Sequence, residues 1–192
     1  MLKIDDIIHF ILTNDLKYTG SHQYSYSRTK TTVPILSPDV QLKLIWKHFS
    51  NYIESRLLKG ESIKIPNFGV FIFTNNNLLN TISNKEFTKS FMDVNKLFTA
   101  KLIFQLDKSY TYILKSFPDE KIKKKIINWN PYLISKNCFM SDIVVNDGIN
   151  SIFKAIYDLV EVGKNLEIEL GFFKFNFNNR EIKYSKDNIF GL

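Results

Sequence analysis

The chain has 192 residues, of which 44% are hydrophobic and 15% are aromatic. This composition can form a buried core, and it excludes the disordered and collagen-like classes of protein. Lysine and arginine together outnumber aspartate and glutamate by 26 to 19, so the formal net charge is +7. Such an imbalance is compatible with a nucleic-acid or acidic protein partner. Whether it supports one depends on where the positive charge lies along the chain.

The single cysteine, Cys138, excludes an intramolecular disulfide framework and every zinc motif that needs several cysteines. Asp5 and Asp6 precede apolar residues that are spaced rather than continuous, which is not the pattern of a secretory signal peptide. No window approaches the roughly 18 uninterrupted apolar residues of a membrane span. These features predict an intracellular protein that does not enter a membrane.

Residues 3–16 are predicted to form an amphipathic helix. Their apolar side chains recur at the spacing of one helical face, at Ile4, Ile7, Ile8 and Ile11. Residues 17–36 are rich in tyrosine, serine and threonine and show no period. We interpret them as a polar connector, with a binding or phosphorylation segment as the alternative.

A second helix is predicted from Ser37 to about Lys59. Ser37 is expected to cap its first N–H groups, Pro38 suits its first turn, and Gly60 stands where a left-handed C-cap belongs. The predicted buried face contains Trp46, Phe49, Ile53 and Leu57. A strand over 63–65 and a second strand after Gly69 should follow.

The same order of elements returns about 103 residues later. A short helix is predicted from Asn130 through Ile134, and a longer one begins at Ser141 and ends before Gly163. The buried face of the longer helix should contain Ile149, Ile152, Ile156 and Val160. An alternating strand, Gly171 and an aromatic strand come next, so the sequence predicts an internal duplication.

The segments around the second copy are less regular. We predict a third strand over 87–91, a mostly helical segment over 94–116 and a basic strand over 121–127. At the C-terminal end, Phe173, Phe175 and Phe177 alternate with polar residues up to Asn178-Asn179. The chain then returns through Ile182 and Tyr184, which predicts a hairpin with a tight turn.

The stretch over residues 58–71, LKGESIKIPNFGVF, resembles the central part of the HU/IHF fold of small DNA-bending proteins. The two copies together are similar to the tandem HU domains of a eukaryotic coiled-coil-domain-containing family associated with centrosomes and cilia, and we expect this chain to lack the coiled-coil tail. The residues that carry the resemblance are Gly60, Phe68, Gly69, Phe71, Gly163, Gly171 and Phe173. Gly69 and Gly171 should occupy equivalent positions, with positive φ or a close backbone approach.

The resemblance implies an α+β fold in which two HU/IHF-like repeats, each with helices packed on a short antiparallel sheet, form an intramolecular pseudo-dimer. We expect an N-terminal helix and connector over 1–36, the first repeat over 37–118 and the second over 119–192. The face that an HU protomer normally buries by dimerising would then be buried within one chain.

DNA-bending members of the HU family use long basic arms and an apolar wedge at the arm tip. Residues 74–86 contain one lysine, no arginine and no proline, and the second hairpin closes at once. The net charge is +8 over residues 1–128 and −1 over 129–192. A surface on which both halves contact a DNA duplex would therefore be positive in only one of them. The densest basic cluster, at Lys121, Lys123, Lys124 and Lys125, is a candidate contact patch for an acidic protein surface or a nucleic-acid backbone. The alternative is a solvated strand edge, where lysines commonly prevent pairing with other strands.

No catalytic motif is present: the sequence has no phosphate-binding glycine loop, no H-E-x-x-H and no nucleophile elbow. His9, His22 and His48 lack metal-ligand spacing, and Cys138 is expected to be a buried small hydrophobe. We therefore expect no enzymatic activity, cofactor or metal.

The leading hypothesis is a non-enzymatic adaptor that binds protein partners in a cytoskeletal or axonemal assembly. The resemblance implies a cilium, basal body or microtubule location, with a tubulin surface as one candidate partner. The alternative is a nuclear HU-like DNA-binding protein without bending arms. A third hypothesis is a small-molecule pocket between the repeats.

Overall fold

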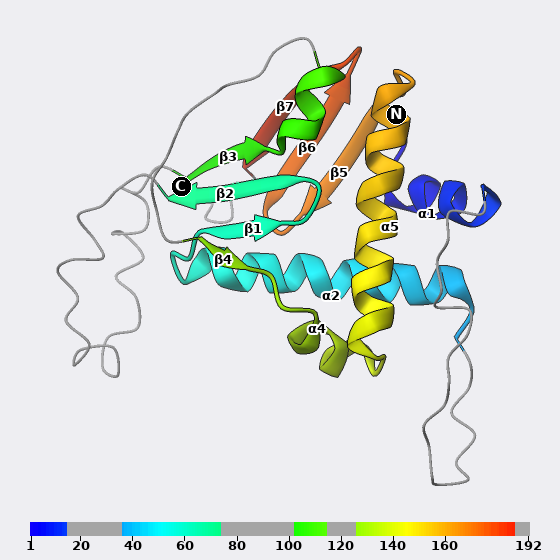
Figure 1. Ribbon diagram of the computed structural model, residues 1–192, viewed down its shortest axis with the longest axis vertical. Coiled ribbons are helices and arrows are strands. Elements are labelled where there is room, and N and C mark those ends of the chain that lie inside the picture. Colours follow the sequence, from blue (N-terminus) through cyan, green and yellow to red (C-terminus); the bar gives the residue numbers. More distant parts are fainter. Residues whose placement is uncertain (15–35, 74–101, 115–125, 187–192) are drawn as a thin grey trace, which may run out of the picture.

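The computed structural model describes residues 1–14, 36–73, 102–114 and 126–186, which form four α-helices, one 3-10 helix and two β-sheets (Figure 1). The helices are α1 (Ile4–Thr13), α2 (Pro38–Leu58), η3 (Lys108–Tyr112), α4 (Pro131–Cys138) and α5 (Asp142–Glu161). The strands are β1 (Ile63–Ile65), β2 (Gly69–Phe73), β3 (Leu102–Leu106), β4 (Ile127–Asn128), β5 (Leu166–Leu170), β6 (Phe173–Asn178) and β7 (Glu181–Lys186). The mixed α+β architecture predicted from the sequence is confirmed. None of the described helices is both long and apolar enough to cross a bilayer.

The predicted long helices are confirmed, together with their buried faces. Trp46 and Phe49 of α2 are buried, and so are Ile152 and Ile156 of α5. Both helices end on a glycine in the left-handed region, with φ of +72° and +79° for Gly60 and Gly163. These glycines accept a conformation that a side chain would strain, so they stop the helices where the next strand must begin.

The two long helices begin differently from one another. Ser141 caps α5 as predicted, because its hydroxyl oxygen accepts a hydrogen bond from the Val144 N–H at 3.3 Å. The predicted Ser37 cap is wrong, since its side chain makes no capping hydrogen bond to α2. The Ser37 hydroxyl instead binds the Asp39 carboxylate, which lowers the pKa of Asp39. α2 therefore begins with Pro38 in its first turn and an acid near its positive end.

The first sheet has the strand order β3-β2-β1-β4, and the second has the order β5-β6-β7. The prediction of a mostly helical segment over residues 94–116 is wrong for residues 102–106, which form β3, whereas residues 108–112 form the 3-10 helix η3. This strand pairs antiparallel with the whole of β2, from Phe73 opposite Leu102 to Gly69 opposite Leu106. Leu-Ile-Phe-Gln-Leu is a short apolar run that is compatible with either a helix or a strand, and the partner strand decides between them.

Other predictions about segments have mixed outcomes. α4 extends to Cys138, four residues past the predicted end at Ile134. The hairpin of β6 and β7 is confirmed, and its two-residue turn has positive φ at Asn179 and Arg180. The predicted strand at 87–91, residues 17–35 of the predicted connector 17–36 and residues 121–125 of the predicted basic strand 121–127 lie outside the described residues.

The expected equivalence of Gly69 and Gly171 is wrong. Gly171 lies in the turn between β5 and β6 with φ +59°, whereas Gly69 is the first residue of β2 and has no positive φ. In the β1–β2 turn the positive φ belongs to Asn67. Gly69 is required for the close approach of β3, since an added Cβ would lie 2.5 Å from the carbonyl oxygen of Gln105.

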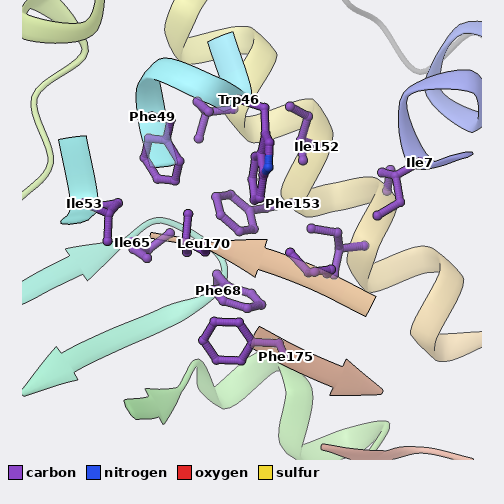
Figure 2. Packing of buried hydrophobic residues seen from close by; sticks show 14 of the residues in the cluster. Ile7, Trp46, Phe49, Ile53, Ile65, Phe68, Ile152, Phe153, Leu170 and Phe175 are labelled. Atoms are coloured by element: carbon purple, nitrogen blue, oxygen red, sulfur yellow. The ribbon is translucent and has the colours of Figure 1, made fainter. Parts of the chain in front are cut away.

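An aromatic layer joins the inner faces of the two sheets and the long helices (Figure 2). The Phe68 ring stacks on Phe153 of α5 at 4.9 Å and meets Phe175 of β6 edge-on at 5.2 Å. Phe71 of β2 and Phe173 of β6 pack at 4.8 Å between ring centroids. Elements from both halves of the chain therefore share one hydrophobic core.

Two short parallel pairings connect the halves reciprocally. The Leu2 N–H donates to the Asn165 carbonyl at 2.9 Å, just before β5, and the Ile127 N–H donates to the Ser62 carbonyl at 2.9 Å, just before β1. Each donor precedes a short helix, α1 in one case and α4 in the other, and both short helices pack against α2 and α5 (Figure 1).

Candidate functional site: the exposed surfaces of the fold

The residues that carried the family resemblance are structural. Phe68, Phe71 and Phe173 are fully or almost fully buried in the aromatic layer, and Gly60 and Gly163 close the long helices. The Gly171 N–H donates to the Ser50 hydroxyl at 2.7 Å, which ties the β5–β6 turn to α2. None of these residues presents a reactive group to solvent, so functional contacts must come from the surface.

The outer face of the two sheets is the first candidate surface. Strand register places six charged side chains on it, three lysines and three glutamates, at Lys64, Lys174, Lys183, Glu167, Glu169 and Glu181. Val70 and Ile103 occupy further outward positions of the first sheet. Among the described strands, these outward positions carry a formal charge of +1 on the first sheet and −1 on the second, which sum to zero.

The charges of the second sheet are also paired with one another. Glu167 lies 2.9 Å from the Lys174 ammonium and 3.7 Å from that of Lys3. The hydrogen bond from Lys174, helped by the charge of both lysines, lowers the pKa of Glu167. These lysines already neutralise a carboxylate, which weakens their attraction for a phosphate.

The tip of the second hairpin does not project a basic arm. The Asn179 N–H donates to the Asn165 side chain at 3.1 Å, and the Arg180 guanidinium donates to the Glu161 carbonyl at 3.1 Å. Arg180 thus lies at the negative end of α5, a favourable position for a cation. The predicted absence of an arm in the second half is confirmed, whereas residues 74–101 lie outside the described part of the first half.

The remaining candidates from the sequence do not form a chemical site. Cys138 is buried near the Leu44 carbonyl, and burial raises the pKa of its thiol to about 11. Among the described residues, no group of three or more histidine, cysteine, aspartate and glutamate side chains could hold a metal ion. The basic patch Lys121, Lys123, Lys124 and Lys125 is outside the described residues, so its role stays a prediction.

Sequence analysis missed an apolar surface on α4 and the start of α5. Its members are exposed residues, with exposed fractions of 53% for Tyr132, 37% for Leu133, 93% for Phe139 and 68% for Ile143. We call these four residues and Lys136 the α4–α5 corner. Phe139 has φ +54° and ψ +35°, the left-handed conformation usually taken by glycine or asparagine at a helix end. A signal was available in the sequence, because Phe139 lies between the two predicted helices and Ile143 lies in the first turn of the longer one, outside its predicted buried face.

A capped helix followed by a short antiparallel sheet with aromatic inner residues defines an HU-like α+β domain. The profile of the family described as CCDC81 eukaryotic HU domain 1 matches residues 19–117. This match covers more than half of the chain, so the chain belongs to that family. HU-like domains are typically non-enzymatic, in agreement with the structural role of the motif residues. No curated protein matches the chain.

Proposed function

We propose that this chain is a non-enzymatic adaptor whose two HU-like repeats pair as an intramolecular pseudo-dimer and bind protein partners in a cytoskeletal assembly. The first repeat includes α1 in this proposal, so that α1 and α4 are counterparts. Covalent linkage keeps the repeats at an effective concentration on the order of 1 mM, which favours pairing within the chain.

The reciprocal contacts between the halves support the pairing. The segment before α1 joins the strand β5 of the other half, and the segment before α4 joins β1. A two-fold relation would produce such an exchange. The contact of Phe71 with Phe173 joins the sheets of the two halves within the aromatic layer.

The neutral outer face of the sheets is the observation that carries the preference for protein partners. Neutralisation of phosphates by lysine and arginine supplies much of the affinity of proteins for DNA, so a DNA-binding surface needs cations that are not already paired with carboxylates. Three glutamates balance three lysines on this face, and Lys174 is held by Glu167. Protein interfaces tolerate such a mixed surface, whereas a duplex would meet repulsive carboxylates.

The cytoskeletal assignment rests on the family resemblance. Membership of the HU domain family of coiled-coil-domain-containing proteins motivates a cilium, basal body or other microtubule structure as the location. Partners there would be proteins of that assembly, with acidic tubulin surfaces among the candidates for the basic residues at 121–125. The chain acts in this proposal as a rigid spacer or connector rather than as a catalyst.

Two measurements test the proposal together. A tagged full chain should colocalise with microtubule-based structures, and the purified chain should give no salt-sensitive shift of a 30-base-pair duplex at 50 mM salt. A DNA-binding role predicts affinity that falls by about 10³ or more between 50 and 200 mM salt if six phosphates are contacted. Chromatin colocalisation combined with that salt dependence would overturn the adaptor function.

A further inference from the structure

The two short helices provide an internal comparison for the surface of the fold. The buried positions of α1 are Ile7, Ile8 and Ile11, and those of α4 are Ile134, Ser135 and Cys138. Both sets have the same spacing and differ by 127 positions. Each helix packs this face against α2 and α5. The outward positions of the two helices can therefore be compared one by one.

Two of the three outward positions change from acidic in α1 to apolar or aromatic in α4. Asp5, Asp6 and His9 of α1 correspond to Tyr132, Leu133 and Lys136 of α4. The acids of α1 have local roles, since Asp6 accepts the Lys3 N–H at 2.8 Å and Asp5 lies 3.2 Å from the Lys43 ammonium. The packing of a short helix on α2 and α5 thus permits polar outward residues, so it does not explain the apolar side chains of α4.

Phe139 makes this contrast stronger. Phe139 is 93% exposed, and its backbone is in the left-handed region that disfavours residues with a Cβ. Ile143 is 68% exposed, whereas Val40, the matching residue at the start of α2, is 41% exposed. Neither the exposure of Phe139 nor its backbone conformation stabilises the fold. Exposed apolar side chains and strained backbone conformations are concentrated at functional positions of proteins.

We propose that the α4–α5 corner binds an amphipathic helix of a partner protein that presents apolar side chains and an acidic side chain. The proposal rests on the adaptor function above and names its contact surface. Phe139, Ile143 and Tyr132 supply the aromatic and aliphatic anchors typical of interface centres. An apolar face repeated every three to four residues would cover them.

The charges at the corner argue for an acidic partner residue. The Lys136 ammonium lies 4.5 Å from the centre of the Tyr132 ring, at the solvent side of the surface. Asp142, the residue before Ile143, accepts a hydrogen bond from the Ile143 N–H at 3.0 Å at the start of α5. A carboxylate of the partner would find Lys136 already positioned beside the aromatic anchor.

A peptide selection on the full chain tests this assignment. The probe is a displayed library of random 16-residue peptides, and enriched peptides are then measured by fluorescence anisotropy. Phe139→Asp combined with Ile143→Asp disrupts the corner. Leu12→Asp combined with Val40→Asp is the matched control, because these residues are 39% and 41% exposed at the corresponding positions of the first half.

We expect enriched peptides with an apolar face and an acidic residue, whose affinity falls at least tenfold with the corner variant and less than twofold with the control. Lys136→Glu should favour basic over acidic peptides. Phe139→Gly separates binding from folding, because it should weaken binding at least tenfold while raising the melting temperature by about 2 to 4 °C.

Peptides that bind the corner variant as tightly as the wild type would overturn the assignment, and so would enrichment of basic peptides alone or the absence of binders. Sedimentation showing a wild-type dimer that the corner variant abolishes would overturn it in favour of a second copy of the chain. Proximity labelling in cells separates the two proposals. If the corner variant still labels cytoskeletal partners, the corner is not the binding surface but the adaptor function stands. If the wild type labels chromatin partners, the adaptor function is wrong.

Discussion

The close approach of β2 and β3 at Gly69 leads to a sharp prediction about stability. A Cβ added at this position would lie 2.5 Å from the Gln105 carbonyl oxygen and 2.6 Å from the Cζ atom of Phe104. The carbonyl belongs to the paired β3 strand, and the Phe104 ring packs on Phe68 and Phe175 at 5.2 and 4.7 Å between centroids. Neither neighbour can move without disturbing the strand pairing or the aromatic layer.

Gly69→Ala should therefore destabilise the fold by about 3 kcal/mol, the upper part of the usual range for overpacking a core. In a chain of this size the melting temperature should fall by roughly 6 to 12 °C. The matched control is Gly163→Ala, where φ is +79° but no atom lies within 4 Å of the added Cβ. It should cost only the backbone strain, about 1 kcal/mol.

Urea unfolding followed by tryptophan fluorescence measures both effects. Trp46 is buried, and Trp129 packs edge-on against Phe49 at 5.5 Å, so both indoles report on the core. Gly69→Ala should lower the urea midpoint more than Gly163→Ala, with similar slopes. A Gly69→Ala cost below about 0.5 kcal/mol, or below that of the control, would refute the steric reasoning and the pairing of β2 with β3.

Three further predictions concern titratable and polar groups. The Tyr110 hydroxyl is buried with no hydrogen-bond partner among the described residues, and burial raises its pKa, so Tyr110→Phe should stabilise the fold by about 1 kcal/mol in urea unfolding; an unchanged or lower stability would indicate a partner for the hydroxyl. The pKa of Cys138 is raised to about 11 by burial, so iodoacetamide should label it at pH 8 only as fast as the chain opens, and labelling at the rate of a free thiol would contradict this. The pKa of Glu167 is lowered by Lys174, so its carboxylate contributes stability above its ordinary pKa of 4.5, and that contribution is lost as the pH falls through the lower folded value. Glu167→Gln should therefore flatten the acid limb of stability measured by thermal melts from pH 6 to 3, and an acid limb as steep as in the wild type would show that the ion pair does not contribute.

Much of the fold could be predicted from local patterns. The faces of α2 and α5 follow from apolar residues at helical spacing, and Gly60 and Gly163 end these helices because they accept positive φ. The hairpin of β6 and β7 follows from alternating phenylalanines and an asparagine-rich turn. Each of these signals acts over a few residues, so no knowledge of the partner elements is needed.

Other features depended on contacts between distant segments. Residues 102–106 became a strand because β2 supplied the hydrogen-bonding partner, and Gly69 is required by the approach of β3 rather than by its own φ. The charge of the outer sheet face could not be predicted from totals of +8 and −1. Strand register decides which side chains share that face, and there it sets three lysines against three glutamates.

The sequence by itself determined an α+β chain with two long helices that each end on a glycine before a strand, no basic arm in the second half and the motif of an HU-like family. Only the tertiary structure decided which residues remain outside that core. In the sequence, Phe139 and Ile143 cannot be distinguished from buried apolar residues, because hydrophobicity alone does not show whether a neighbouring element covers them. Packing of α4 on α2 and α5 buries Cys138 and leaves Phe139 exposed, since adjacent positions at a helix end point to different sides.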